Sequence, residues 1–183
     1  MIVYRKMVAE DLCDSTLAYF CHNQIWHRQW VKKENRWVLE EHDGSRCWDA
    51  EKRVWVSGYI KEQLQRGGRA VAAFDGEQLV AFACVDGKLQ GDSVRYANLA
   101  MIFVDDRYQK RGIGKKLMNT VKKDAIEMGA DILFVSAIPS EETVAFYLSI
   151  GCRDAERIIP EFVDAEKDRL LELCLQEIPP LHI

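Results

Sequence analysis

A basic segment punctuated by glycines is the part of this sequence best suited to bind a ligand. It reads Gln109-Lys110-Arg111-Gly112-Ile113-Gly114-Lys115 and follows an apolar run at 98–104. An amphipathic pattern begins at Ile113, and a helix that starts there would direct unpaired N–H groups and the positive end of its dipole toward the loop. Glycines let the backbone approach an anion closely, because no Cβ intervenes. The segment therefore predicts a site for a phosphate-bearing ligand.

The elements that would position this loop alternate between strand and helix patterns. Apolar runs predict strands at 2–5, 69–74, 78–85, 94–104, 132–138, 157–159 and 170–175, with a hairpin turn at Asp75-Gly76. Helical patterns begin at Glu10 and cover 56–66, 113–128 and 140–150, the last with Ser140 as a favourable N-cap. The order predicts an α/β (α+β) fold with a mixed sheet, whose parallel neighbours follow from the helical crossovers after 104 and 138.

The segment 24–57 is set apart by its tryptophans. All five lie in it, at Trp26, Trp30, Trp37, Trp48 and Trp55. Trp26 and Trp30 are one helical turn apart, so they share a face if the segment is helical. We therefore expect a tryptophan-rich helical insertion at about 24–57.

Composition bounds the class of protein. The 183 residues correspond to one domain, 48% of them are hydrophobic, and the net charge of −4 argues against a general nucleic-acid binder. The six cysteines form no C-x-x-C pair, which favours a reduced cytoplasmic protein with no metal site. We see no signal peptide and no apolar run long enough to span a membrane.

Two motifs carry a resemblance to a known family. The stretch Val104-Asp105-Asp106-Arg107-Tyr108 and the glycine segment after it resemble the GCN5-related N-acetyltransferase (GNAT) superfamily, whose pattern is (Arg/Gln)-x-x-Gly-x-(Gly/Ala). A second match runs from Ala145 to Cys152, where the family usually ends in Gly-Phe. The overlap covers about 69–152. It implies a GNAT-type central mixed, mostly antiparallel sheet with flanking helices and a parallel splayed strand pair, in a single domain over 1–178 followed by a tail at 179–183.

The resemblance also implies a co-substrate and the residues that bind it. The glycine loop would hold the pyrophosphate of acetyl-CoA, and the preceding strand end would pair with its pantetheine arm. The cofactor-binding residues implied are Ile102, Phe103, Val104, Gln109, Lys110, Arg111, Gly112, Ile113, Gly114, Lys115 and Ser140. Ser140 replaces an asparagine that the family often has, and a serine can still cap the helix and donate a hydrogen bond.

Tyr147 is the catalytic residue that the resemblance implies, as the proton donor to the departing CoA thiolate. A backbone N–H near Phe103 could stabilise the oxyanion, and direct transfer in a ternary complex requires no covalent intermediate. The general base stays open. His27 and Glu34 lie in the segment that family topology places over the acceptor, where either a structural or exposed role or a catalytic one is conceivable, and a water relay without a dedicated side-chain base is a further alternative. Trp26, Trp30 and Asn98 are the candidate substrate contacts. The tryptophans are either a satellite core or an aromatic wall for a cationic amine.

The function that we expect from these features is a cytoplasmic, acetyl-CoA-dependent N-acetyltransferase (a transferase of the acyltransferase class). Its acceptor would be a primary amine, with a small molecule preferred because we see no extra docking module. We expect no metal, nucleic-acid or membrane partner, and the final strand is compatible with a homodimer. The alternatives are a protein N-acetyltransferase, an enzyme that uses a longer acyl group, and a non-catalytic acyl-CoA-binding or regulatory module.

Overall fold

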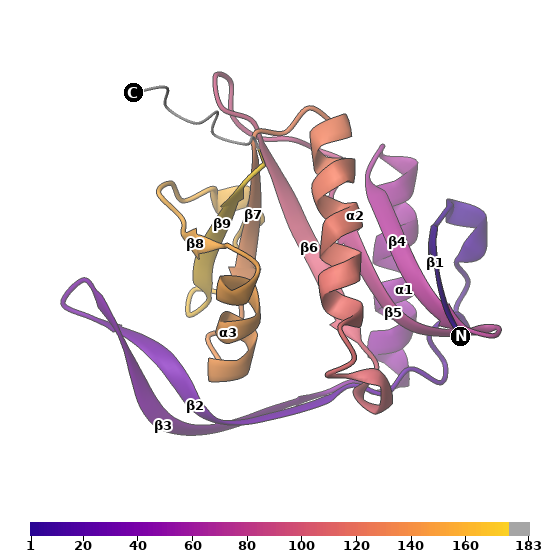
Figure 1. Ribbon diagram of the computed structural model, residues 1–183, viewed down its shortest axis with the longest axis horizontal. Coiled ribbons are helices and arrows are strands. Elements are labelled where there is room, and N and C mark those ends of the chain that lie inside the picture. The colour runs from indigo at the N-terminus through magenta and orange to yellow at the C-terminus, as the bar shows by residue number, and fades with distance from the viewer. Residues whose placement is uncertain (176–183) are drawn as a thin grey trace.

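The computed structural model describes residues 1–175, which build one seven-stranded mixed sheet and a separate hairpin (Figure 1). The strand order is β1 (Ile2–Lys6), β4 (Arg69–Asp75), β5 (Gln78–Val85), β6 (Tyr96–Val104), β7 (Ile132–Ala137), β9 (Arg169–Cys174) and β8 (Arg153–Asp154). Neighbouring strands are antiparallel except for β6 and β7, which are parallel. The predicted GNAT-type sheet is therefore confirmed.

Helices cover both faces of the sheet. The α2 helix (Ile113–Glu127) packs on the face to which Val71 and Ala73 of β4 point, whereas α1 (Ala50–Gln65) packs on the opposite face with Ala70 and Ala72. The alternation of these strand residues between two apolar clusters explains why β4 is an unbroken apolar run. The third helix, α3 (Glu141–Ser149), follows β7 and begins at the predicted N-cap, Ser140.

The two parallel strands separate after three residue pairs. Tyr96–Asn98 pair with Ile132–Phe134, after which β6 continues only along β5 and β7 only along β9. The register between β5 and β6 shifts by one residue at Ala100, a bulge that bends β6 away from β7. The carboxyl ends of the two strands consequently diverge, and α2 and α3 begin on either side of the opening (Figure 1).

The tryptophan-rich segment is mostly a β-hairpin, so the prediction of a helical insertion at 24–57 is wrong. Strands β2 (Asn23–Lys33) and β3 (Arg36–Cys47) pair through a tight turn in which Glu34 and Asn35 have φ values of 45° and 65°. Only the start of α1 falls within the predicted helix. We call residues 23–47 the arm, which runs below α3 in Figure 1 and belongs to no part of the main sheet.

Two further expectations differ from the structure. The pattern at Glu10 produces only a short 3₁₀ turn, Ala9–Asp11, followed by irregular turns. No strand forms at 157–159, because the chain there leads into another 3₁₀ turn, Pro160–Phe162. The proposed tail at 179–183 lies outside the described residues. Among residues 1–175, no helix is both long and apolar enough to cross a membrane.

Candidate active site

A cavity of about 940 Å³ lies where β6 and β7 separate. One wall is the end of β6, including Ile102, Phe103 and Val104, and another is the glycine loop that leads into α2. Tyr147 of α3 also lines it. The remaining walls come from the base of the arm and from the loop before β9. The splayed strands thus bring together most of the residues that the family resemblance singled out.

The glycine loop has the backbone expected of an anion site. Gly112 has φ 76° and Lys110 has φ 59°, and α2 begins directly after Gly112. The Lys116 N–H bonds back to the Gly112 carbonyl at 3.2 Å, so the N–H groups of the residues before Lys116 lie in the orphan first turn of the helix. These loop residues line the cavity except for Arg111, whose Nη2 donates instead to the Arg107 carbonyl at 2.8 Å.

Packing also favours a glycine at position 114. A Cβ at this position would lie 3.2 Å from the Phe146 ring, closer than ordinary contact. The first turn of α2 therefore lies against α3, and this contact brings the glycine loop and the helix that carries Tyr147 to one end of the cavity.

Tyr147 is buried, with 7% of its surface exposed, and it lines the cavity. Among the described residues its hydroxyl makes no hydrogen bond, which leaves it free to donate to a ligand. Burial raises the pKa of Tyr147, and the nearby Cys152, Asp164 and Asp168 raise it further. The phenol therefore stays protonated at any physiological pH, as a proton donor must.

Four further predicted site residues do not line the cavity. Ser140 is fully buried, caps α3 by accepting from the Thr143 N–H at 3.3 Å, and is also bonded to Gln24 of the arm at 3.2 Å. Asn98 is buried and donates to Asp86 at 2.7 Å. Trp26 and Trp30 lie on the arm, away from the cavity wall. Ser140 and Asn98 therefore support the structure around the cavity.

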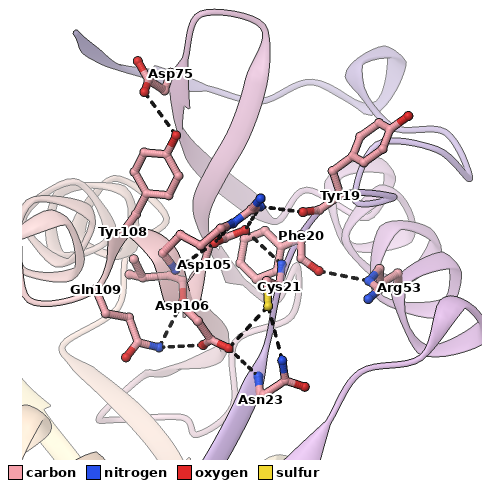
Figure 2. A network of polar contacts seen from close by, with 12 residues as sticks. Tyr19, Phe20, Cys21, Asn23, Arg53, Asp75, Asp105, Asp106, Tyr108 and Gln109 are labelled. Carbon is pink, nitrogen blue, oxygen red and sulfur yellow. Dashed lines mark hydrogen bonds and ion pairs between the residues drawn. The ribbon is translucent and has the colours of Figure 1, made fainter.

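A polar network fastens the segment before the arm to the glycine loop (Figure 2). The fully buried carboxylate of Asp105 accepts from the Cys21 N–H at 2.9 Å and from the Arg107 guanidinium at 2.9 and 2.7 Å. Arg107 in turn donates to the Tyr19 carbonyl at 2.7 Å. Burial alone would raise the pKa of Asp105, but the hydrogen bonds from Arg107 and Cys21 outweigh it and lower the pKa. The carboxylate therefore stays charged and joins residues that are 84 positions apart.

Asp106 extends the same network to the arm itself. Its carboxylate accepts from the Asn23 N–H at 2.6 Å and from the Gln109 side chain at 2.9 Å (Figure 2). Asp105 and Asp106 thus fix the start of the arm against the predicted phosphate loop, a role that depends on tertiary contacts.

An aromatic cluster packs around Phe103, which lines the cavity. Trp48, directly after the arm, packs on Phe103 with a centroid distance of 4.6 Å and on Phe20 at 5.6 Å. His22 packs on Trp48 and on Phe103, both at 4.9 Å. Burial lowers the pKa of His22, so its ring is neutral at pH 7. Of the two interpretations of the tryptophans, Trp48 fits the satellite core.

Two carboxylates line the cavity from the loop before β9. Ser136 of β7 donates to Asp168 at 2.8 Å and accepts from the Asp164 N–H at 3.1 Å, which fixes the loop to the strand end. Burial raises the pKa of Asp164 to about 6, with Asp168 and Asp86 adding to the shift and Arg46 opposing it. Within the described chain, no cationic nitrogen lies within 4.0 Å of either carboxylate. This end of the cavity therefore suits a cationic group.

Sequence reasoning missed two kinds of cavity residue. Some lie next to predicted site residues in the chain: Asp106, Tyr108, Glu142, Thr143 and Phe146. Others reach the cavity from distant segments: His22, Asn23, Gln24, Ile25, Arg46, Asp164 and Asp168. If 23–33 had been predicted as a strand, Asn23, Gln24 and Ile25 could have been placed beside the glycine loop. Nothing local distinguishes Asp164 or Asp168 from surface acids.

Comparison with known proteins identifies the family. A model of the acetyltransferase (GNAT) family matches residues 15–151. The chain therefore belongs to this family and is an acetyltransferase. A search among curated proteins found no match to the sequence.

Solved structures with the same fold support this assignment. Nourseothricin acetyltransferase shares 15% identity with a TM-score of 0.63, over 93% of this chain and 95% of its own. A protein from Bacillus anthracis str. Ames assigned as a streptothricin acetyltransferase, solved with acetyl coenzyme A, shares 15% identity with a TM-score of 0.64, over 94% and 96%. An aminoglycoside 6'-N-acetyltransferase with coenzyme A shares 17% identity with a TM-score of 0.54, over 67% and 81%. At these identities the likeness concerns the fold.

Proposed function

We propose that this acetyltransferase transfers the acetyl group of acetyl-CoA directly to a primary amine of a small molecule. The observation that supports the proposal is a single cavity with a glycine loop at a helix start, a protonated tyrosine and an acidic end. Its volume of about 940 Å³ is in the range of small-molecule sites. Several solved structures with this fold are named as acetyltransferases of nourseothricin, streptothricin or aminoglycosides, which agrees with the proposal.

In this proposal, acetyl-CoA lies along the end of β6 with its pyrophosphate at the first turn of α2. The backbone N–H groups around Gly112 and the helix dipole would neutralise the phosphates. Lys110 and Lys115, which also line the cavity, would add positive charge. The residues Ile102, Phe103 and Val104 would pair with the pantetheine arm through their backbone, since β7 leaves that edge of β6 unpaired beyond Asn98.

The chemical step would consist of attack by the neutral amine on the thioester carbonyl. A C–N bond forms, the C–S bond breaks, and the amine proton passes to solvent or to a nearby base. Tyr147 would deliver its proton to the leaving thiolate and recover one from solvent. Burial raises the pKa of Tyr147, so the phenol is protonated and can donate a hydrogen bond to the thiolate as it leaves.

The acceptor would carry a second cationic group besides the reacting amine. Asp168 is half-buried and Asp164 is exposed; both line the cavity, and neither carboxylate has a close cation in the described chain. By contrast, the fully buried carboxylates of residues 1–175, Asp105, Asp124 and Glu172, each form an ion pair with a basic side chain. A diamine or an aminated antibiotic would supply the missing charge.

Thiol release from acetyl-CoA tests the proposal on a panel of amines. The panel consists of streptothricin, kanamycin, 1,5-diaminopentane, pentylamine and a lysine-containing peptide. We expect thiol release with at least one small amine, and faster release with 1,5-diaminopentane than with pentylamine. Release with the peptide alone would instead indicate a protein N-acetyltransferase.

We propose the reducing cytoplasm as the location of this protein. The free thiols fit that location; they are at Cys13, Cys21, Cys47, Cys84 and Cys152.

A further inference from the structure

Arg169 of β9 contacts two tryptophans of the arm at once. Its guanidinium carbon lies 5.0 Å from the centroid of the Trp30 ring and 4.8 Å from that of Trp37. Trp30 pairs with Leu39 and Trp37 with Lys32, so the two rings are diagonal neighbours on one face of the arm. Both distances are within the range of cation–π attraction.

The guanidinium is fixed from its other side by β8. Arg169 donates through Nε and Nη2 to Asp154, at 2.8 and 3.2 Å. Only 7% of Arg169 is exposed, and its Nη1 has no hydrogen-bond partner in the described chain. A buried guanidinium nitrogen without an acceptor is costly unless another interaction stabilises the charge. The ring faces of Trp30 and Trp37 provide that interaction.

The arm depends on such contacts for its position. It forms its own two-stranded sheet, and an isolated hairpin is marginally stable in water. Its other ties beyond the base are the Trp30 N–H bond to the Pro139 carbonyl at 2.7 Å and the bidentate pair of Arg28 with Glu141 at 2.9 and 2.6 Å. All of these contacts reach the β7–α3 junction or β9, which are the elements beside the cavity (Figure 1).

The arm is also a wall of the cavity. Asn23, Gln24 and Ile25 of β2 and Arg46 of β3 line it, and Arg46 is close enough to Asp164 and Asp168 to lower the pKa of both carboxyls, against the rise that burial causes. Asp105 and Asp106 hold the segments around the arm's base, whereas its outer half is held by the contact of Arg169 with Trp30 and Trp37 and by the bonds to Pro139 and Glu141. A change in the tilt of the outer half would therefore move the wall that an acceptor would touch.

We propose that Arg169 is a positioning residue that holds the arm as the acceptor-facing wall of the active site by its contact with Trp30 and Trp37. The proposal rests on the proposed function for its kinetic consequence, but not for its structural one. It assigns Trp30 and Trp37 to the geometry of the acceptor site without direct contact with the acceptor. Acetyl-CoA binding would not depend on it, because the glycine loop is held separately.

Trp37→Leu and Arg169→Lys test the proposal, with Trp55→Leu as the matched control. Trp55 is half-exposed on α1 and contacts Lys52 and Tyr59 rather than the arm. The first readout is hydrogen exchange of the arm amides, above all the Trp30 amide that bonds to Pro139. We expect exchange about three- to tenfold faster in both test variants, the size expected from losing one cation–π contact, and unchanged in the control.

The second readout separates positioning from mere stability. With the best amine of the panel above, we expect the acceptor KM to rise about three- to tenfold in Trp37→Leu, with kcat and the acetyl-CoA Kd within about twofold of wild type. Unchanged exchange would overturn the contact as a support of the arm. Faster exchange with an unchanged acceptor KM would overturn its role in the active site. If no amine is acetylated, the proposed function fails, whereas the exchange rates still decide whether Arg169 holds the arm.

Discussion

Gly112→Ala separates phosphate binding from backbone strain in the glycine loop. Gly112 has φ 76°, and no heavy atom lies within 4 Å of the place where its Cβ would stand. In the ligand-free protein an alanine therefore meets no steric clash and only the cost of a left-handed backbone. If the loop holds the pyrophosphate of acetyl-CoA, the added methyl group would instead occupy the space next to the phosphate oxygens.

Typical free energies give the size of the loss of stability and of the loss of acetyl-CoA binding. A left-handed alanine costs about 1–2 kcal/mol. In a chain of 183 residues this corresponds to a melting temperature lower by about 2–8 °C, since each 1 kcal/mol shifts it by about 2–4 °C. The methyl group would also displace the phosphate from the N–H groups at the helix start. We expect a loss of at least about 1.4 kcal/mol of binding, which is tenfold in Kd.

Gly67→Ala is the matched control. Gly67, at the end of α1, also has a positive φ of 91°, has open space within 4 Å of the point that a Cβ would occupy, and does not line the cavity. It should lose a similar amount of thermal stability, yet bind acetyl-CoA as the wild type does. Calorimetric titration gives the Kd, and thermal melts without ligand give the stability. Equal affinities for the two variants would refute the assignment of this loop to the pyrophosphate.

Three further predictions concern single side chains. Tyr147→Phe should lower kcat by about 10²-fold or more with the acetyl-CoA Kd nearly unchanged, and an unaltered kcat would remove Tyr147 from the chemistry. Asp164→Asn should raise the melting temperature at pH 7.5. Burial raises the pKa of the Asp164 carboxyl in the folded protein from 3.8 to about 6, so above that pH the charge of the carboxylate destabilises the folded state. The same variant should raise the acceptor KM at pH 7.5 but not at pH 5, where the wild-type carboxyl is protonated; a ratio of KM values that does not vary with pH would contradict this. Asp105→Asn should lower the free energy of unfolding by about 3 kcal/mol, because a buried carboxylate that pairs with Arg107 is lost. Chemical denaturation measures this free energy, and a change below about 1 kcal/mol would count against the network in Figure 2.

The glycine loop could be predicted from the sequence because its signals are local. Gly112 marks a left-handed position, and Ile113, Leu117 and Val121 repeat at the spacing of a helix that packs on a sheet. Ser140 fulfils its predicted role as a cap by the same kind of short-range bond. Helix starts and turns depend on neighbouring residues, so they are visible in a single sequence.

The arm could not be predicted from its tryptophans. A spacing of four places Trp26 and Trp30 on the same face of a helix and also of a strand, so the pattern fits both. Its turn, at Glu34 and Asn35, contains no glycine and gives only a weak hairpin signal. The pairing of Trp26 with Gly44 determines that the segment is a strand and not a helix. A Cβ at Gly44 would lie 2.3 Å from the indole, and this contact is not local in sequence.

The acidic end of the cavity depends on tertiary contacts alone. Asp164 and Asp168 reach it because Ser136 fixes their loop to the end of β7, 28 and 32 residues away in the chain. The network around Asp105 is of the same kind, since it bonds to a backbone N–H 84 residues earlier. Such long-range bonds determine the proposed acceptor side, whereas the proposed cofactor side follows from one continuous motif.

Thiol release from acetyl-CoA with the amine panel, measured for the wild type and for Tyr147→Phe, tests the central claim most directly. The account predicts that at least one small amine releases CoA at a rate that Tyr147→Phe lowers by about 10²-fold. Tight acetyl-CoA binding without thiol release for any amine would contradict it, and would indicate a module that binds acyl-CoA without turnover.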